Sequence, residues 1–121
     1  MRTEITKITE AIESLVAGVQ SKPAIEDGLT YVIARGKNSG ATAGFLVSQK
    51  GEEVVLRQAR KLWYWSGAAS LYELADRGVS KPENCKFPKA ITEVKILDCC
   101  EIIGVSESGK KSIEGVKIWT A

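Results

Sequence analysis

Histidine is absent from the 121-residue sequence, and this absence limits the chemistry available to the chain. Histidine is the usual general base near neutral pH and the commonest metal ligand in proteins. Without it, the Ser-His and Cys-His pairs that activate a nucleophile cannot form. Lysine or carboxylate side chains could still move a proton, so the absence argues against an enzyme without excluding one. We therefore expect no catalytic residues, no metal and no cofactor.

Long apolar runs are also missing, since none approaches the ~20 residues that a membrane-spanning helix needs. The first five residues alternate polar with apolar and include an acid, which is unlike a signal peptide. The three cysteines are an odd number, and Cys99 and Cys100, as neighbours on a strand, would point to opposite faces. They are poor disulfide partners, and the cysteine spacing does not suit a metal site. These features predict a reduced, cytosolic setting without membrane contact.

A strong charge of either sign is lacking as well. The formal net charge of +2 is too balanced to indicate nucleic-acid binding by itself. A content of 44% hydrophobic and 26% charged residues is typical of one globular domain. The basic residues nevertheless gather in two stretches, Arg57, Arg60 and Lys61 in one and Lys110 and Lys111 in the other.

The N-terminal segment, residues 1–22, predicts an amphipathic helix over residues 3–20. Its apolar residues follow a helical spacing of three and four. They form one narrow stripe of Ile5, Ile8, Ile12, Leu15 and Val19. The stripe could pack on the sheet of the same chain or against another subunit, and the pattern allows both.

The remainder, residues 29–121, predicts a ligand-binding domain that is mostly an antiparallel sheet, so the fold class is α+β within one structural domain. β-branched and aromatic runs separated by turn residues indicate three strands in a meander. A short helix is expected after the third strand, with Leu71, Leu74 and Ala75 on one face. One long strand follows it. The expected ranges are 29–35, 41–49 and 52–65 for the meander, 67–78 for the helix, 91–105 for the long strand, 108–114 for a helical turn and 116–119 for a last short strand.

The third predicted strand offers a candidate binding face. Strict alternation would place Arg57 and Lys61 on the same face as Trp63 and Trp65. Indole rings stack on bases and the cations hold phosphates, which is the combination that a nucleotide requires. The alternative is that the indoles belong to the core and the cations lie at its rim.

Two further segments carry candidate binding residues. The loop over residues 36–40 has glycine at both ends. Its backbone N–H groups, with Lys37 and the short polar side chains of Asn38 and Ser39, could hold an anion; an ordinary hairpin turn is the alternative. The loop over residues 81–88, bounded by prolines, contains Asn84 and Phe87. Binding residues often gather in such loops, although an aromatic side chain there can equally anchor the loop.

One stretch of the sequence resembles a known family. Residues 59–71 read Ala-Arg-Lys-Leu-Trp-Tyr-Trp-Ser-Gly-Ala-Ala-Ser-Leu, and this motif is similar to that of a small domain widespread in phage genomes. The resemblance covers residues 29–114 and includes Glu101-Ile102-Ile103 and Lys111-Ser112-Ile113. With its N-terminal helix, the chain resembles the Thoeris anti-defence protein 1 family within that domain.

This resemblance implies a phage sponge for an immune signal. Such proteins bind a cyclic ADP-ribose isomer, glycocyclic ADP-ribose, made by Thoeris TIR proteins in the infected bacterial cytoplasm, and hold it without cleaving it. It further implies a homo-oligomer built from dimers, a hexamer, and in some members a second site for cyclic di- or trinucleotides. The family pocket uses an aromatic ring, an amide and basic residues near the C-terminus. Their counterparts here would be Phe87, Asn84, Lys110 and Lys111.

Two other functions remain open from the sequence. The first is a phage accessory module that binds protein or nucleic acid through the strand face of Arg57, Lys61, Trp63 and Trp65. The second is a nucleotide hydrolase that uses a carboxylate, Glu101 or Asp98, as its acid or base.

Overall fold

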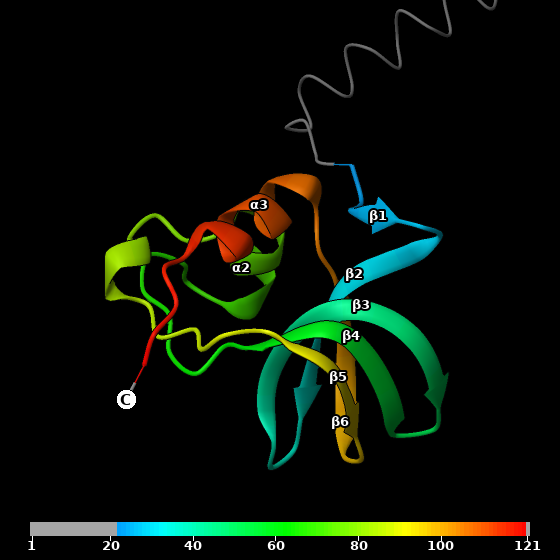
Figure 1. Ribbon diagram of the computed structural model, residues 1–121. Helices are drawn as coiled ribbons and strands as arrows, with labels where there is room; N and C mark the ends of the chain where they lie inside the picture. Colours follow the sequence, from blue (N-terminus) through cyan, green and yellow to red (C-terminus); the bar gives the residue numbers. More distant parts are fainter. Residues whose placement is uncertain (1–21, 121) are drawn as a thin grey trace, which may run out of the picture.

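The computed structural model describes residues 22–120 and shows one curved antiparallel sheet with two helices packed against it (Figure 1). All strand pairings within the sheet are antiparallel. The strands are β1 (Ile25–Glu26), β2 (Leu29–Gly36), β3 (Gly40–Lys50), β4 (Glu53–Lys61), β5 (Ile91–Ile96) and β6 (Cys99–Gly104), and the helices are α2 (Leu71–Arg77), the short 3-10 helix η1 (Pro82–Asn84) and α3 (Glu107–Gly115). The predicted mixed fold with a mostly antiparallel sheet is therefore confirmed.

The order of the strands shows how strongly the sheet curves. β2, β3, β4 and β5 are neighbours in chain order, and β6 pairs with the other side of β2. β5 and β6 therefore lie on opposite edges, although only Leu97 and Asp98 separate them in the chain. Two consecutive strands can reach opposite edges only if the sheet curls toward closure.

The single long strand expected over residues 91–105 is consequently wrong. The chain turns at Asp98, whose carbonyl accepts a hydrogen bond of 3.0 Å from the backbone N–H of Lys37. From there β6 runs along β2, where Glu101 lies opposite Arg35. The β-branched run predicted extended backbone correctly, but it carried no sign that the two halves pair with different strands.

The meander of β2, β3 and β4 agrees with the sequence prediction, whereas its ends and the helices differ in detail. β4 ends at Lys61 rather than near Trp65. The short helix was expected after the third strand. It follows the fourth, β4, because the structure has an additional two-residue strand, β1, before the meander. The N-terminal helix expected over residues 3–20 lies outside the described residues.

The two longer helices begin at serine caps. The Ser70 side chain accepts a hydrogen bond of 3.2 Å from the Glu73 N–H at the start of α2. Ser106 does the same at the start of α3, at 2.9 Å from the Gly109 N–H. Each cap satisfies an N–H group that the first turn of a helix leaves unpaired.

The two faces of the sheet pack into two separate cores. The first, which we call the helix-side core, lies between the sheet and the helices. The second, the inner core, lies within the curve of the sheet, where side chains from both ends of the sheet meet. The helix-side core includes Tyr31, Ile33, Phe45, Leu62, Leu74, Phe87, Val105 and Ile113, and the inner core comprises Val32, Ala34, Val54, Leu56, Ala59, Ile96 and Cys99.

All three cysteines are free, and Cys99 is buried while its neighbour Cys100 is exposed, as the alternation of strand side chains predicts.

Within the described residues, no helix is long and apolar enough to cross a membrane.

Candidate functional site

A bulge in β4 changes which side chains share a face. Gln58 has a positive φ of 51°, and the pairing of β4 with β3 shifts in register next to it. As a result Leu56 and Ala59, three residues apart, both pack into the inner core. Arg57 and Lys61 therefore lie on opposite faces, because one extra residue reverses the alternation. The predicted shared face of Arg57, Lys61, Trp63 and Trp65 is wrong.

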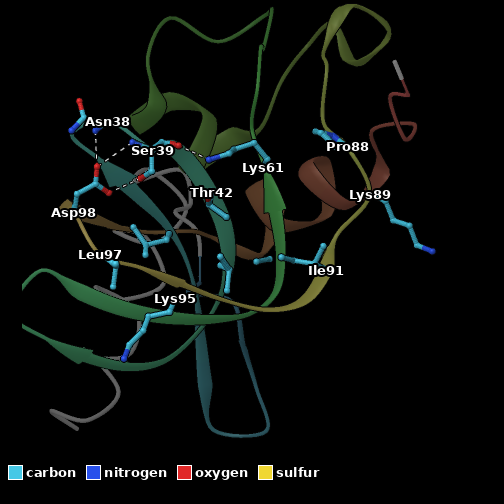
Figure 2. A pocket seen from close by; sticks show the side chains of 13 residues that line it. Asn38, Ser39, Thr42, Lys61, Pro88, Lys89, Ile91, Lys95, Leu97 and Asp98 are labelled. Carbon is cyan, nitrogen blue, oxygen red and sulfur yellow. Dashed lines mark hydrogen bonds between the residues drawn. The ribbon is translucent and has the colours of Figure 1, made fainter.

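A cavity of about 570 Å³ lies on the inner-core side of the sheet, next to β5. Its wall is mostly apolar and is formed by β4, β5 and the segment that leads into β5. Its polar end is formed by the turn between β2 and β3 and by the turn between β5 and β6 (Figure 2). The lining residues are Asn38, Ser39, Thr42, Ala59, Lys61, Pro88, Lys89, Ile91, Val94, Lys95, Ile96, Leu97 and Asp98.

Asp98 organises the polar end of the cavity. Its carboxylate accepts hydrogen bonds from the Asn38 N–H at 2.6 Å, the Ser39 N–H at 3.1 Å and the Ser39 hydroxyl at 2.7 Å. The Lys61 ammonium donates to the Ser39 carbonyl from the other side. Figure 2 shows Lys61 and Asp98 pointing toward the turn from two different strand ends. The loop over residues 36–40, which was predicted to bind anions, is thus itself fixed by the Asp98 carboxylate on one side and the Lys61 ammonium on the other.

These hydrogen bonds also determine the charge of Asp98. The bond from the Ser39 hydroxyl and that from the Asn38 N–H hold the pKa of the carboxyl below its usual range. A carboxyl with a lowered pKa stays ionised at neutral pH and is a weak base, so Asp98 is poorly suited to move protons there.

Replacing Asp98 by asparagine tests this arrangement through the pH dependence of stability. Because its pKa is lowered in the folded state, the carboxylate stabilises the fold above its ordinary pKa and loses this effect as the pH falls through the lowered value. We expect D98N to unfold at a lower urea concentration than the wild type at neutral pH, and the two midpoints to converge in acid. The exposed Glu83→Gln in η1 serves as control. A difference between D98N and the wild type that stays constant with pH would contradict the prediction.

The other two lysines of the cavity lie at its rim. The Lys95 ammonium is 3.5 Å from Glu53, and both side chains are more than half exposed. Figure 2 shows the Lys89 side chain directed away from the other lining residues. Lys61 is therefore the cation directed into the polar end of the cavity, and the rim lysines add positive charge around the opening.

The predicted residues on and after β4 are dispersed over the molecule. Arg57 forms an exposed ion pair with Glu93 at 3.5 Å. The Trp63 side chain is 66% exposed, whereas Trp65 packs against the helix-side core. The strand face that was expected to stack a base does not exist as one surface.

The loop residues also differ in their placement. Phe87 is completely buried in the helix-side core, so the interpretation as a loop anchor applies to it. Asn84 is exposed at the end of η1. Lys37 forms an exposed ion pair with Glu52 at 3.4 Å. None of the three lines the cavity.

Lys110 is a largely buried cation with two acidic partners. Its ammonium lies 2.8 Å from both Glu26 and Glu114, and its side chain is only 12% exposed. It also lies over the rings of Tyr31 and Phe45. Burial acts to lower the pKa of Lys110, but the hydrogen bonds to Glu114 and Glu26 outweigh it and raise the pKa above its usual range. With its charge balanced in this way, Lys110 fastens α3 to β1.

Lys111 follows on the exposed side of α3. It lines a separate hollow of about 310 Å³ together with Glu26 and Glu107. Those two carboxylates oppose the binding of a phosphate at this place, because like charges repel. Neither Lys110 nor Lys111 lines the cavity beside β5.

The second carboxylate considered as a catalytic group, Glu101, belongs to another cluster. The Tyr72 hydroxyl donates a hydrogen bond to one of its oxygens, and the Arg35 guanidinium donates to the other at 2.8 Å. These two bonds hold the pKa of Glu101 below its usual range. Glu101 does not line the cavity, and the cluster connects α2 to β6 and β2.

Within residues 22–120, no three acidic or cysteine side chains lie close enough to hold a metal ion. The cavity residues that the sequence analysis overlooked are Lys89, Lys95 and the apolar wall of β5. Four residues that the sequence analysis named as candidates, Asn38, Ser39, Lys61 and Asp98, do line the cavity, but no sequence pattern indicated that they lie together beside β5.

The fold and the cavity define a class of protein: a small α+β domain whose curved antiparallel sheet carries a largely apolar cavity beside an edge strand. The family model described as "Domain of unknown function (DUF6948)" matches residues 29–113. The chain belongs to this family. No curated protein and no solved structure matches it.

Proposed function

We propose that this chain binds a nucleotide signal, a cyclic ADP-ribose isomer, in the cavity beside β5 and holds it without cleaving it. The observation that carries the proposal is the cavity of about 570 Å³ with an apolar wall and Lys61 at its polar end. Ligand sites commonly have this size and combine apolar walls with a few placed polar groups.

The two parts of such a ligand match the two parts of the cavity. A base and the carbon framework of the riboses would lie against Ile91, Val94 and Ile96. The phosphates would lie toward Lys61 and the rim lysines, since an ammonium group holds phosphate oxygens as a point charge. The ionised Asp98 opposes a phosphate at this end, but the three lysines that line the cavity outnumber this single carboxylate. The Asn38 side chain lines the same end and could hydrogen-bond a ribose or a base edge.

Sequestration without cleavage is supported by the lack of a suitable acid or base. The whole sequence contains no histidine. The carboxyl at the cavity, Asp98, has a lowered pKa and is already engaged by three hydrogen bonds. Raising its pKa toward neutrality would require burial away from cations, whereas Lys61 lies beside the same turn.

The resemblance to the Thoeris anti-defence protein 1 family supports placing this activity in the cytoplasm of an infected bacterium. There the chain would lower the free concentration of a signal made by TIR proteins. A sponge competes with the effector by affinity, so we expect a dissociation constant of ~1 nM or below, which corresponds to a binding free energy of about −12 kcal/mol. The alternative of a nucleic-acid-binding strand face has lost its structural basis, because the bulge at Gln58 separates Arg57 from Lys61.

A pair of matched variants tests the location of the site. Lys61→Met keeps the aliphatic stem and removes the charge at the cavity. Arg57→Met makes the same change on the opposite face of β4, the outer face, which points away from the inner core. We expect K61M to weaken binding of the cyclic nucleotide by roughly 10- to 100-fold, since a lost charge-assisted hydrogen bond costs about 1.5–3 kcal/mol. R57M should bind like the wild type. Isothermal titration calorimetry measures both, with melting temperatures confirming that each variant is folded.

The opposite result, weak binding by R57M and normal binding by K61M, would place the ligand on the outer face and contradict the proposal. A second assay separates sequestration from catalysis. The saturated protein is incubated for hours and heat-denatured, and the released nucleotide is chromatographed. Full recovery of the cyclic compound is expected, whereas linear ADP-ribose that accumulates with time would identify a hydrolase.

A further inference from the structure

β5 is an edge strand whose outer side is unpaired in the described part of the chain. It pairs with β4 on one side, and β6, which follows it, pairs with β2 instead. Among residues 22–120, no backbone hydrogen bond joins the outer side of β5 to another segment. An edge of this kind presents unpaired N–H and C=O groups and accepts another strand readily.

The residues of this edge are complementary to themselves when two copies run antiparallel. The segment from Ile91 to Leu97 reads Ile-Thr-Glu-Val-Lys-Ile-Leu. With Val94 opposite Val94 of the second copy, Glu93 lies opposite Lys95 and Ile91 lies opposite Leu97. Ile91 and Leu97 are among the exposed large apolar residues, at 54% and 64%. Pairing would cover them.

The charges extend this match across the sheet. Within one chain, Arg57 of β4 pairs with Glu93 at 3.5 Å, and Glu53 pairs with Lys95 at 3.5 Å. In the antiparallel arrangement, the outer face would carry alternating charges in the order Arg57, Glu93, Lys95 of the second copy and Glu53 of the second copy. An in-register parallel arrangement would instead place Glu93 beside Glu93, and like charges directly opposite are destabilising.

We propose that two copies of this chain join edge to edge through β5, antiparallel and centred on Val94, to form one continuous sheet. The second copy would also complete the ligand cavity, because Val94, Lys95, Ile96 and Leu97 line it. The two cavities then open at one shared interface, so that each copy contributes side chains to the rim of both. This pairing does not depend on which ligand the cavity takes.

Charge-reversal variants test the pairing directly. In Glu93→Lys alone, the introduced ammonium group meets Lys95 of the other copy at both ends of the symmetric pair. In Lys95→Glu alone, two carboxylates meet in the same way. Each single variant should therefore associate at least tenfold more weakly than the wild type. Light scattering near the wild-type dissociation constant should show the mean mass falling toward half.

The mixture of the two single variants is the decisive sample. An E93K chain beside a K95E chain restores both opposite-charge contacts, so the mixture should recover the wild-type mass although neither component does so alone. Loss of the ion pairs within each chain cannot produce this recovery, because mixing leaves them unchanged. The double variant E93K/K95E should also recover, although it places like charges beside Arg57 and Glu53 within the chain.

Failure of the mixture to recover, or single variants with the wild-type mass, would overturn the proposal. A wild-type protein that is monomeric at all accessible concentrations would do the same. If a single variant does not fold, hydrogen exchange of the wild type decides the question. Amides of residues 91–97 should become more protected as the protein concentration rises, and exchange that is independent of concentration would contradict edge pairing. Protection that requires added extended peptide would point to a foreign strand as the occupant and equally exclude a second copy.

Discussion

Replacing Arg60 by methionine should lower the free energy of unfolding by about 3–5 kcal/mol, because each buried carbonyl left without a donor costs ~1–3 kcal/mol. This is the largest loss that we expect from the removal of one side chain. Arg60 is only 6% exposed. Its guanidinium donates to the carbonyls of Phe87 at 2.9 Å, Pro88 at 2.8 Å, Ile113 at 2.7 Å and Val116 at 2.7 Å.

These four bonds explain why a cation is retained in the core. Burial lowers the pKa of Arg60, yet arginine keeps its proton and offers a planar set of donors that lysine cannot match. Arg60→Lys should therefore be intermediate between the wild type and R60M. Urea unfolding followed by circular dichroism measures all three, with the exposed Arg57→Met as control at within ~1 kcal/mol of the wild type. An R60M protein as stable as that control would show that the four carbonyls find other donors.

Gly78→Ala should destabilise the fold by about 2–5 kcal/mol, from backbone strain and overpacking together. Gly78 ends α2 with a φ of 84° and a ψ of −157°, a conformation that is essentially restricted to glycine. A Cβ atom there would lie 2.0 Å from the Cβ atom of Ser112 in α3. The substitution would therefore force α2 and α3 apart in addition to straining the chain.

Gly28→Ala provides the matched control for this prediction. Gly28 has a similar φ of 78°, but nothing lies within 4 Å of the position that its Cβ would occupy. It should show the backbone cost alone, about 1–2 kcal/mol. Thermal unfolding of both variants then separates the cost of a positive φ, which they share, from the additional cost in G78A of its glycine-restricted ψ and its contact with Ser112. Equal losses in G78A and G28A would mean that α3 moves away without cost, contrary to the close packing of the two helices.

Local sequence patterns predicted the elements whose cause is local. The β-branched and aromatic run over residues 29–35 indicated β2, and the glycines at positions 36 and 40 marked the turn that leads into β3. The helical spacing of Leu71, Leu74 and Ala75 indicated α2. The adjacent cysteines were expected on opposite faces, and one is buried while the other is exposed. In each case the signal lies within a few residues of its effect.

The candidate site was less predictable because its causes are distant in the chain. Strict alternation placed Arg57 and Lys61 on one face, and a single bulged residue, Gln58, reversed this. The sequence offered Lys110 as a free cation, but Glu26, 84 positions away, and Glu114 balance its charge. The sequence was equally compatible with Phe87 as a binding residue or as a loop anchor, and the fold placed it in the core.

By itself, then, the sequence determined most of the extended and helical segments, the turns of the β2–β3–β4 meander and the absence of imidazole chemistry, since these depend on residue type and short-range spacing. The tertiary structure alone decided that Asp98 meets Ser39 across 59 positions, that Arg60 gathers carbonyls from two distant segments, and that a cavity lies beside β5. Such contacts arise from how the sheet curls and which strand edges remain unpaired. Curvature and pairing are properties of all the strands together, so no single segment of the chain encodes them.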